Sequence, residues 1–351
     1  MLGSALVSAS MSVAAASRVC VIGAGAAGLC AAKALRAAGL ECTVLEQRAE
    51  VGGVWNRLED DTSPPENPVY DSLNTNLPKE IMAFWDFPFP SSLPSFVGHA
   101  EVQRYLEDYA EAHGLRDPNV VRLRTRVERV WREDGVASGV PPRWHVLSRS
   151  LADGPNAPPT RETFAAVVVA NGHFATPIVP ALRGREDFEA SGATVVHSAG
   201  YRRPASVGIG GSSGGDASAA TPPGVVVVGS GPSGIDISLE LAEAGADVTL
   251  SIRSGEYPAV RDTRIAYAPA ISDLLPNGTA RFVDGSVSSR LRTGVTTSVN
   301  HICNHICNHI CNHICNHSLG LVSAAHSHPR DRVRVRLPLP GARVGAGLLR
   351  R

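Results

Sequence analysis

The stretch that decides the fold is RVCVIGAGAAGLCAAKALRAAGLECTVLE, residues 18–46. Residues 18–22 are a short apolar run that predicts a strand ending at a glycine. Residues 26–38 are rich in Ala and predict a helix, which a second glycine ends. Residues 42–46 predict another strand. Strand, helix and strand in this order indicate a βαβ unit and therefore a parallel sheet.

The turn between the first strand and the helix carries the pattern G-x-G-x-x-G. Gly23 permits the tight turn, Gly25 lets the backbone approach a pyrophosphate, and Gly28 lets helix and strand pack closely. The N–H groups and the dipole at the start of the helix favour phosphate. Glu46 closes the second strand, where a carboxylate accepts hydrogen bonds from ribose hydroxyls. A purely structural glycine turn is the alternative. The predicted dinucleotide site comprises Gly23, Ala24, Gly25, Ala26, Ala27, Gly28 and Glu46.

A second unit of the same kind follows later in the chain. Residues 225–228 and 247–252 predict strands, and residues 233–244 predict the helix between them. Two such units imply two dinucleotides, and a flavin with a nicotinamide is the standard pair because hydride passes between them. Arg253 follows the second strand where an acid would repel a 2′-phosphate, which favours NADPH over NADH. A solvated surface arginine is the alternative. This cradle comprises Gly229, Ser230, Gly231, Pro232, Ser233 and Gly234.

Composition sets the outer limits of this interpretation. The chain has 351 residues, which favours two domains, and 43% of them are hydrophobic, enough for two cores. The 33 basic residues balance the 33 acidic ones, so nothing indicates a nucleic-acid partner. No apolar run is long enough for a membrane span. Cys20, Cys30 and Cys42 lie in or beside apolar runs and are expected to be buried, reduced thiols, as in a cytoplasmic protein. The absence of a C-x-x-C pair disfavours a flavin disulfide reductase.

Other segments complete the organisation. Residues 101–113 have the apolar spacing of a helix, and residues 127–131, 144–147 and 164–169 are expected to be strands. Residues 60–95 are rich in Pro and aromatic side chains and predict a long ordered loop. The low-complexity run 206–223 is expected to be a flexible insertion.

Several motifs outside the cradles resemble the flavin-containing monooxygenases, in particular their plant and fungal branches. They are Gly52-Gly53-Val54-Trp55, the blocks YDSLNTNLPKE at 70–80 and FPFP at 87–90, and ANGHF at 170–174. The family signature F-x-G-x-x-x-H-x-x-x-Y ends here at His197 and Tyr201, although its start departs, since Phe188 and Gly192 lie at other offsets. Tyr201 in place of Trp-Pro argues against the Baeyer–Villiger branch. The resemblance covers about residues 18–286.

This resemblance implies an activity. Members use NADPH to reduce FAD, and the reduced flavin takes up O2 to form a hydroperoxide that oxygenates a soft nitrogen or sulfur centre, as in N,N-dimethylaniline monooxygenases. The implied partners are a small amine or thioether and O2. The protein's part is positioning and exclusion of water.

The resemblance also implies roles for single residues. Asn76 would be the catalytic residue, beside flavin and nicotinamide, and Thr75 would help to hold NADP+. Gly53, Val54 and Trp55 would contact FAD, and Asn171 and Gly172 would lie where the chain crosses between the cofactor domains. A turn residue is the alternative for Asn76, which precedes Leu77-Pro78, and core packing is the alternative for Trp55.

Beyond residue 286 the resemblance stops. Asp284-Gly285-Ser286 matches a family landmark, but the aspartate and Thr-Gly-Tyr expected after it are missing. Residues 301–317 instead repeat His-Ile-Cys-Asn. This spacing places His and Cys in helical stripes that suit zinc, yet perfect repetition is typical of a translated tandem repeat, so no metal site is predicted. Two alternatives to the monooxygenase therefore stay open: a cofactor-binding remnant without turnover, and an NADPH oxidase or reductase that releases hydrogen peroxide.

The expected fold class is α/β, with two Rossmann-like dinucleotide-binding domains. Residues 18–200 are expected to form the FAD domain, incomplete at its C-terminal part, and residues 201–285 the NADPH domain. Residues 1–17 are expected to be a disordered or targeting extension, and residues 286–351 a divergent tail. The expected location is the cytoplasm.

Overall fold

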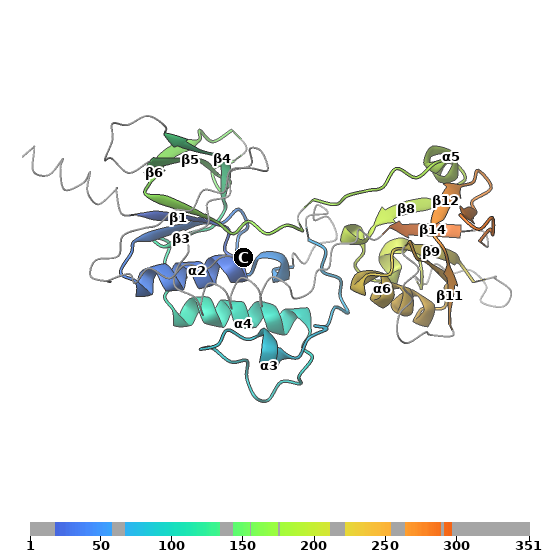
Figure 1. Cartoon of the computed structure of the whole chain (residues 1–351), viewed down its shortest axis with the longest axis horizontal. Coiled ribbons are helices and arrows are strands. Elements are labelled where there is room, and N and C mark those ends of the chain that lie inside the picture. Colours follow the sequence, from blue (N-terminus) through green and yellow to red (C-terminus); the bar gives the residue numbers. More distant parts are fainter. Residues whose placement is uncertain are drawn as a thin grey trace, which may run out of the picture. The chain divides into compact units, whose positions relative to one another are not determined.

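The computed structural model describes residues 18–57, 67–133, 143–154, 156–174, 176–210, 222–253 and 264–288, together with the backbone of 291–296 (Figure 1). These residues form two compact units. Unit 1 combines the described residues of Met1–Ala49 and Leu115–Ala170, and unit 2 those of Glu50–Gly114 and Asn171–Asn308.

Unit 1 is built on a parallel sheet of four strands in the order β3-β2-β1-β7. Val19 of β1 lies opposite Cys42 of β2 and Ala166 of β7, so β1 is central. Helix α2 connects β1 to β2 and buries Leu29 and Leu35. The predicted βαβ unit is therefore present. The elements are β1 (Val19–Ile22), α2 (Ala26–Ala37), β2 (Cys42–Leu45), β3 (Val121–Arg122) and β7 (Ala166–Val169).

An antiparallel sheet packs against this parallel sheet within unit 1. It has the order β4-β5-β6, formed by β4 (Thr125–Glu133), β5 (Arg143–Ser150) and β6 (Thr160–Phe164). Cys20, Leu45, Val146 and Phe164 share its core. The single strand expected at 164–169 is thus divided, because Phe164 ends β6 while the next residues pair with β1. Burial raises the pKa of the Cys20 thiol to about 12, so this side chain is a neutral core residue.

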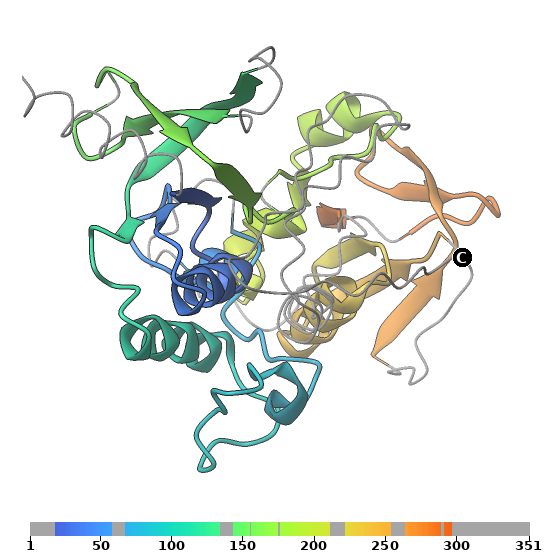
Figure 2. The same cartoon turned by 60° about the vertical axis from the view of Figure 1, so that its left-hand side comes forward.

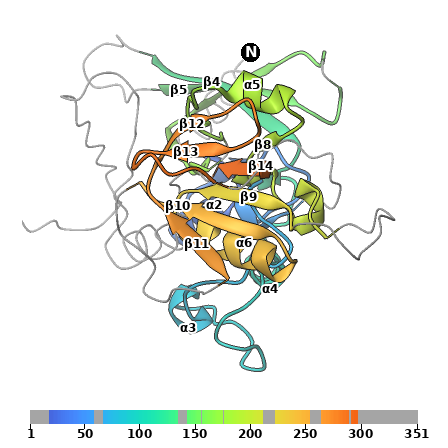
Figure 3. The ribbon, with the colours of Figure 1, turned by 90° about the vertical axis from the view of Figure 1, so that its right-hand side faces the viewer.

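Unit 2 contains a parallel sheet of five strands in the order β11-β10-β9-β14-β8. Figure 3 shows these strands side by side, with α6 next to them. Phe188, Val226, Leu274 and Phe282 form its core. The elements are α5 (Arg185–Ala190), β8 (Thr194–His197), β9 (Gly224–Val228), α6 (Pro232–Glu243), β10 (Asp247–Ser251), β11 (Ile265–Ala268), the hairpin β12 (Ile271–Leu274) and β13 (Ala280–Phe282), and β14 (Leu291–Thr296). The expected α/β class with two Rossmann-like sheets is confirmed.

Two strands of this sheet come from segments that the sequence analysis assigned elsewhere. β8 precedes residue 200, and β14 falls in the segment that was expected to be a divergent tail. β14 pairs in parallel with both β8 and β9, so the sheet is continuous only through it. Its short sequence LRTGVT carries no periodic signal, and long-range pairing alone defines it. The extension 1–17, most of the insertion at 211–221 and the repeat at 301–317 lie outside the described residues.

Unit 2 also contains an aromatic loop, residues 83–98, which joins α3 to α4 (Figure 2). Its aromatic side chains pack on α4. The Phe89 ring stacks on Tyr105 with centroids 3.8 Å apart. The Tyr105 hydroxyl accepts from the N–H of Phe84 and donates to the carbonyl of Phe87. The described part of the predicted loop is therefore ordered by side-chain packing. The helices are α3 (Lys79–Met82) and α4 (His99–Ala112), with the 3-10 turn η1 at Gly53–Trp55.

Candidate functional site

The first cradle lies between β1 and α2 in unit 1. Gly23 has a φ of 99°, and its N–H donates to the carbonyl of Leu45 over 2.8 Å. Helix α2 begins after Gly25, and no side chain caps its N-terminus. A Cβ on Gly28 would lie 1.9 Å from the carbonyl oxygen of Gly23. The loop therefore needs glycine at both ends, one for its backbone conformation and one for close packing.

Glu46 holds this loop in place. The carboxylate is only 5% exposed, and its two oxygens accept hydrogen bonds of 2.7 Å from the N–H groups of Ala24 and Arg48. An ionised carboxylate has about four acceptor positions, so two bonds do not exhaust it. Glu46 thus fixes the cradle and keeps acceptor capacity for hydroxyl groups. Its predicted contact with a ribose stays a prediction.

The second cradle repeats the geometry in unit 2. Gly229 has a φ of 110° and donates its N–H to the carbonyl of Ser251 over 2.9 Å. Helix α6 begins with Pro232 after Gly231, again without a side-chain cap. A Cβ on Gly231 would meet nothing within 4 Å, so open space lies beside this residue. Ser230 and Ser233 flank the turn and are partly exposed, and Gly234 is buried in the first turn.

Both cradles fit a pyrophosphate. Neither helix carries an acidic residue in its first turn that would repel an anion from the positive end of the helix dipole. The N-cap residues, Gly25 and Gly231, have no side chain to cap the first N–H groups of either helix. Arg253 lies exposed two residues beyond the end of β10, where the sequence predicts contact with a 2′-phosphate.

The turn at Gly53, Val54 and Trp55 packs on α4. A Cβ on the preceding Gly52 would lie 1.9 Å from Oε1 of Gln103, whose amide donates to the carbonyl of Val51. The Trp55 side chain is buried, as the core-packing interpretation requires, and it lines a cavity of about 350 Å³. The other lining residues are Arg57, His99, Ala100, Gln103, Arg104 and Glu107. Burial, assisted by Arg57, lowers the pKa of His99. Contact of the turn with FAD stays a prediction.

Thr75 and Asn76 lie on a segment paired with the start of α4. Thr75 is buried, its N–H donates to the carbonyl of Val97, and its hydroxyl accepts from the N–H of Val97 over 3.1 Å. The Thr75 hydroxyl is thus already used by the fold, whereas the next residue, Asn76, is exposed. The bonds that fix Thr75 therefore also fix the backbone next to the exposed Asn76. Their predicted roles toward NADP+ and the flavin stay predictions.

Asn171 and Gly172 lie where the chain leaves unit 1. The N–H of Ala170 donates to the carbonyl of Ile22 in the first sheet, and unit 2 resumes at Asn171. Gly172 has a φ of 70°, which favours glycine in this bend. A boundary between the two units therefore falls at these residues, and their place between two cofactor domains stays a prediction.

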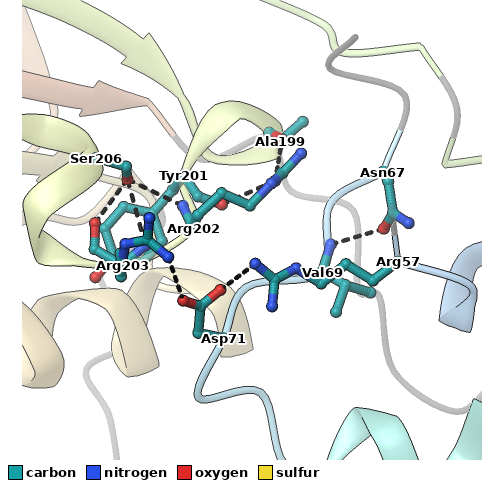
Figure 4. Close-up of polar contacts among 9 residues, drawn as sticks. All are labelled: Arg57, Asn67, Val69, Asp71, Ala199, Tyr201, Arg202, Arg203 and Ser206. Atoms are coloured by element: carbon teal, nitrogen blue, oxygen red, sulfur yellow. Dashed lines mark hydrogen bonds and ion pairs between the residues drawn. The ribbon is translucent and has the colours of Figure 1, made fainter. Parts of the chain in front are cut away.

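Unit 2 also contains a polar network that the sequence motifs did not reveal, shown in part in Figure 4. The Asp71 carboxylate pairs with Arg57 and Arg203, while Tyr70 and Tyr201 donate to carboxylates on α6. Tyr70 and Asp71 open the YDSLNTNLPKE block, and Tyr201 ends the other family signature, so both motifs already marked these positions. Their acidic partners, Asp236 and Glu240, are one helical turn apart, a spacing that places them on the same face of α6.

The described part of the chain contains neither a metal-binding cluster nor a membrane-spanning helix. No group of three or more His, Cys, Asp or Glu residues there is arranged to hold a metal ion, and the His-Ile-Cys-Asn repeat lies outside it. None of its helices combines the length and apolar character needed to cross a membrane.

The sequence and structure match known proteins. A family model described as Flavin-binding monooxygenase-like matches residues 16–313. An Arabidopsis thaliana protein described as flavin-containing monooxygenase FMO GS-OX-like 9 is 36% identical over 77% of this chain and 59% of its own length. The Oryctolagus cuniculus dimethylaniline monooxygenase [N-oxide-forming] 2 is 31% identical over 72% of this chain and 43% of its own.

Among solved structures, S-allyl-L-cysteine S-oxygenase from Allium sativum aligns with a TM-score of 0.65 and 28% identity. The alignment covers 82% of this chain and 63% of that protein. The chain thus spans less than two thirds of the length of the relatives named here.

Proposed function

Because the chain belongs to the flavin-binding monooxygenase-like family, we propose that it binds FAD in the first cradle and NADPH in the second. With O2 as co-substrate, it oxygenates a soft nitrogen or sulfur centre of a small molecule. The chain covers 59% of its Arabidopsis relative, so this whole-protein activity is the proposal and the family is its premise.

The presence of two cradles of the same geometry carries the proposal. In each, a strand ends at a glycine of positive φ whose N–H donates to the neighbouring strand, and a helix with an uncapped N-terminus follows. A protein that used a single nucleotide would need only one such turn. Two such turns suit a chain that binds both a nicotinamide and a flavin dinucleotide, between which hydride passes.

Residues of unit 1 hold the pyrophosphate and the ribose of FAD, and residues of the Glu50–Gly114 segment contact its flavin ring. The start of α2 faces the pyrophosphate, Gly23 and Gly28 allow the backbone to come close, and Glu46 accepts from the ribose. Gly53, Val54 and Trp55 then contact the flavin, and Asn76 donates a hydrogen bond to it. When bound, the flavin supplies hydride acceptance and oxygen activation. The chain positions the reactants and excludes water.

Arg253 gives the second cradle its choice of nicotinamide. The guanidinium is exposed just beyond β10, and a bidentate contact with the 2′-phosphate favours NADPH. The preference for sulfur or nitrogen centres follows the relatives, whose names specify S-oxygenation in Allium and N-oxide formation in the rabbit protein. We place the protein in the cytoplasm, since the three cysteines of the described residues form no disulfide.

The test measures products against NADPH consumed. The purified chain, loaded with FAD, is given NADPH, O2 and a thioether or a tertiary amine. The proposal predicts sulfoxide or N-oxide in proportion to the NADPH oxidised. Hydrogen peroxide as the sole product, with or without the thioether, would instead make the protein an NADPH oxidase. No NADPH consumption by flavin-loaded protein would make it a cofactor-binding remnant.

A further inference from the structure

Three segments of unit 2 meet around Tyr70 and Asp71. One is the chain after the Gly53–Trp55 turn. The second is the loop that leads to Thr75 and Asn76. The third comprises the residues before β9 together with helix α6. We propose that Tyr70 and Asp71 form a positioning latch, which holds the Asn76 segment against α6 and so sets the approach of the nicotinamide to the flavin. This inference rests on the proposed function for its effect on hydride transfer, but the latch itself does not.

Asp71 joins two of the segments through its carboxylate (Figure 4). One oxygen lies 2.5 Å from a guanidinium nitrogen of Arg57, and the other lies 3.2 Å from Arg203. The Asp71 N–H also donates to the carbonyl of Arg202 over 2.9 Å. Arg202 is itself buried, and its guanidinium donates to the carbonyls of Ala199 and Tyr201. Asp71 is therefore fixed by its backbone and by both carboxylate oxygens.

Tyr70 joins the same loop to α6. The side chain is buried, and its hydroxyl donates to Oδ2 of Asp236 over 2.6 Å. Tyr201 makes the parallel contact, donating to Oε2 of Glu240 over 2.8 Å, and the two tyrosine rings meet edge to face at 6.1 Å. Asp236 lies two residues after Gly234, the last glycine of the second cradle. The latch thus acts on the first turns of the helix whose N-terminus faces the phosphates.

The Tyr70 hydrogen bond also affects the ionisation of Asp236. Burial raises the pKa of Asp236, and the hydrogen bond from Tyr70 opposes that rise. Without the hydroxyl, the carboxylate loses its charge-stabilising donor. The loop that carries Tyr70 runs on to Thr75, which is held by Val97, so residues 70–75 are anchored at both ends and Asn76 follows directly. Because hydride transfer depends steeply on the approach of donor and acceptor, releasing one anchor is expected to slow it.

The first test needs no cofactor. Backbone hydrogen exchange is measured on the full chain and on Tyr70→Phe, which keeps the ring and removes the hydroxyl. The matched control is Tyr105→Phe, which removes a buried hydroxyl that accepts from the N–H of Phe84 and donates to the carbonyl of Phe87. The latch predicts exchange at least about tenfold faster in residues 67–76 of the first variant only. Equal protection of that segment in the wild type and Tyr70→Phe, or the same loss in Tyr105→Phe, would overturn it.

A second variant covers the case in which Tyr70→Phe does not fold. Arg203→Gln alters a half-exposed side chain and removes one of the two ion pairs of Asp71. It is expected to speed exchange in the same segment, and an unchanged segment would contradict the latch.

The last readout is the anaerobic reduction of bound flavin by NADPH in rapid-mixing experiments. For Tyr70→Phe we expect the limiting rate to fall about 10- to 100-fold, with flavin content and NADPH affinity unchanged. A rate equal to that of Tyr105→Phe would show that the latch does not position the nicotinamide. If the wild-type chain takes up no flavin, the proposed function fails, whereas the exchange experiment still decides whether the latch exists.

Discussion

The backbone at Gly28 passes so close to Gly23 that a Cβ on Gly28 would lie 1.9 Å from the Gly23 carbonyl oxygen. That oxygen belongs to a residue whose φ of 99° is itself restricted to glycine. The two glycines therefore define the first cradle together, one by conformation and one by the space it leaves free. The second cradle reuses the conformation at Gly229, and its middle glycine, Gly231, has open space beside it, so methyl groups added at Gly28 and at Gly231 should have different effects.

Gly28→Ala is expected to destabilise the protein by about 1–3 kcal/mol, because the methyl group must displace backbone. It is also expected to abolish flavin binding. Gly231→Ala is the matched control, since a methyl group there meets nothing and its extended φ of −68° suits Ala. Its unfolding free energy should change by less than about 1 kcal/mol. Urea unfolding of the two variants checks this, and equal destabilisation would contradict the cradle geometry.

Glu46→Gln should weaken both the loop and the flavin site. Glu46 accepts hydrogen bonds from two N–H groups, and in the variant one of these groups would face an amide donor. The free energy of unfolding should fall by about 1–3 kcal/mol. Loss of the charged acceptor should lower FAD affinity about 10- to 100-fold. Titration of the FAD-free protein with FAD measures it, with the exposed Glu41→Gln as control. Unchanged affinity in Glu46→Gln would place the ribose elsewhere.

Arg253→Ala tests the nicotinamide preference. Loss of a charge-assisted contact with the 2′-phosphate should weaken NADPH binding about 10- to 100-fold and leave NADH binding nearly unchanged. Arg185→Ala, which removes an arginine paired with Glu189 on α5, is the control. Kd values for both nucleotides are measured by fluorescence titration. A parallel loss for NADH and NADPH would exclude recognition of the 2′-phosphate by Arg253.

The lowered pKa of His197 predicts that the stability of the protein depends on pH. Burial lowers the pKa of His197 below its usual value near 6.5, and its Nδ1 accepts from the N–H of Ala199. Stability from the neutral ring is therefore complete above about pH 6.5 and is lost as the pH falls toward the lowered pKa. His197→Asn keeps an acceptor but does not titrate.

The stability advantage of the wild type over His197→Asn should accordingly shrink between pH 7.5 and 5.5. His99, whose pKa is also lowered, is present in both proteins and cancels in the difference. Urea unfolding at the two pH values measures it. A constant difference would mean that His197 does not titrate in this range.

Features coded by neighbouring residues were predictable from sequence. The spacing of Gly23, Gly25 and Gly28 between an apolar run and an Ala-rich run specifies a local turn, and β1, α2 and β2 follow it closely. The same holds for β9, α6 and β10. The Gly28 close approach was also inferred correctly, because the reason for that glycine is local packing.

Features defined by long-range pairing were not predictable. β14 has six residues without periodicity and is recognised only by its pairing with β8 and β9. The Tyr70–Asp236 bond joins residues 166 positions apart, so no local pattern reveals it. Family motifs marked Tyr70 and Tyr201, but only the fold shows that their hydroxyls reach the same face of α6.

The most direct test of the central claim is the flavin content of the chain and its response to NADPH. The purified full chain is incubated with FAD, freed of unbound FAD and examined by visible spectroscopy, first alone and then with NADPH without oxygen. The account predicts one FAD per chain, whose visible absorption is bleached by NADPH and returns when air is admitted. A folded chain that stays colourless after incubation with FAD would contradict it.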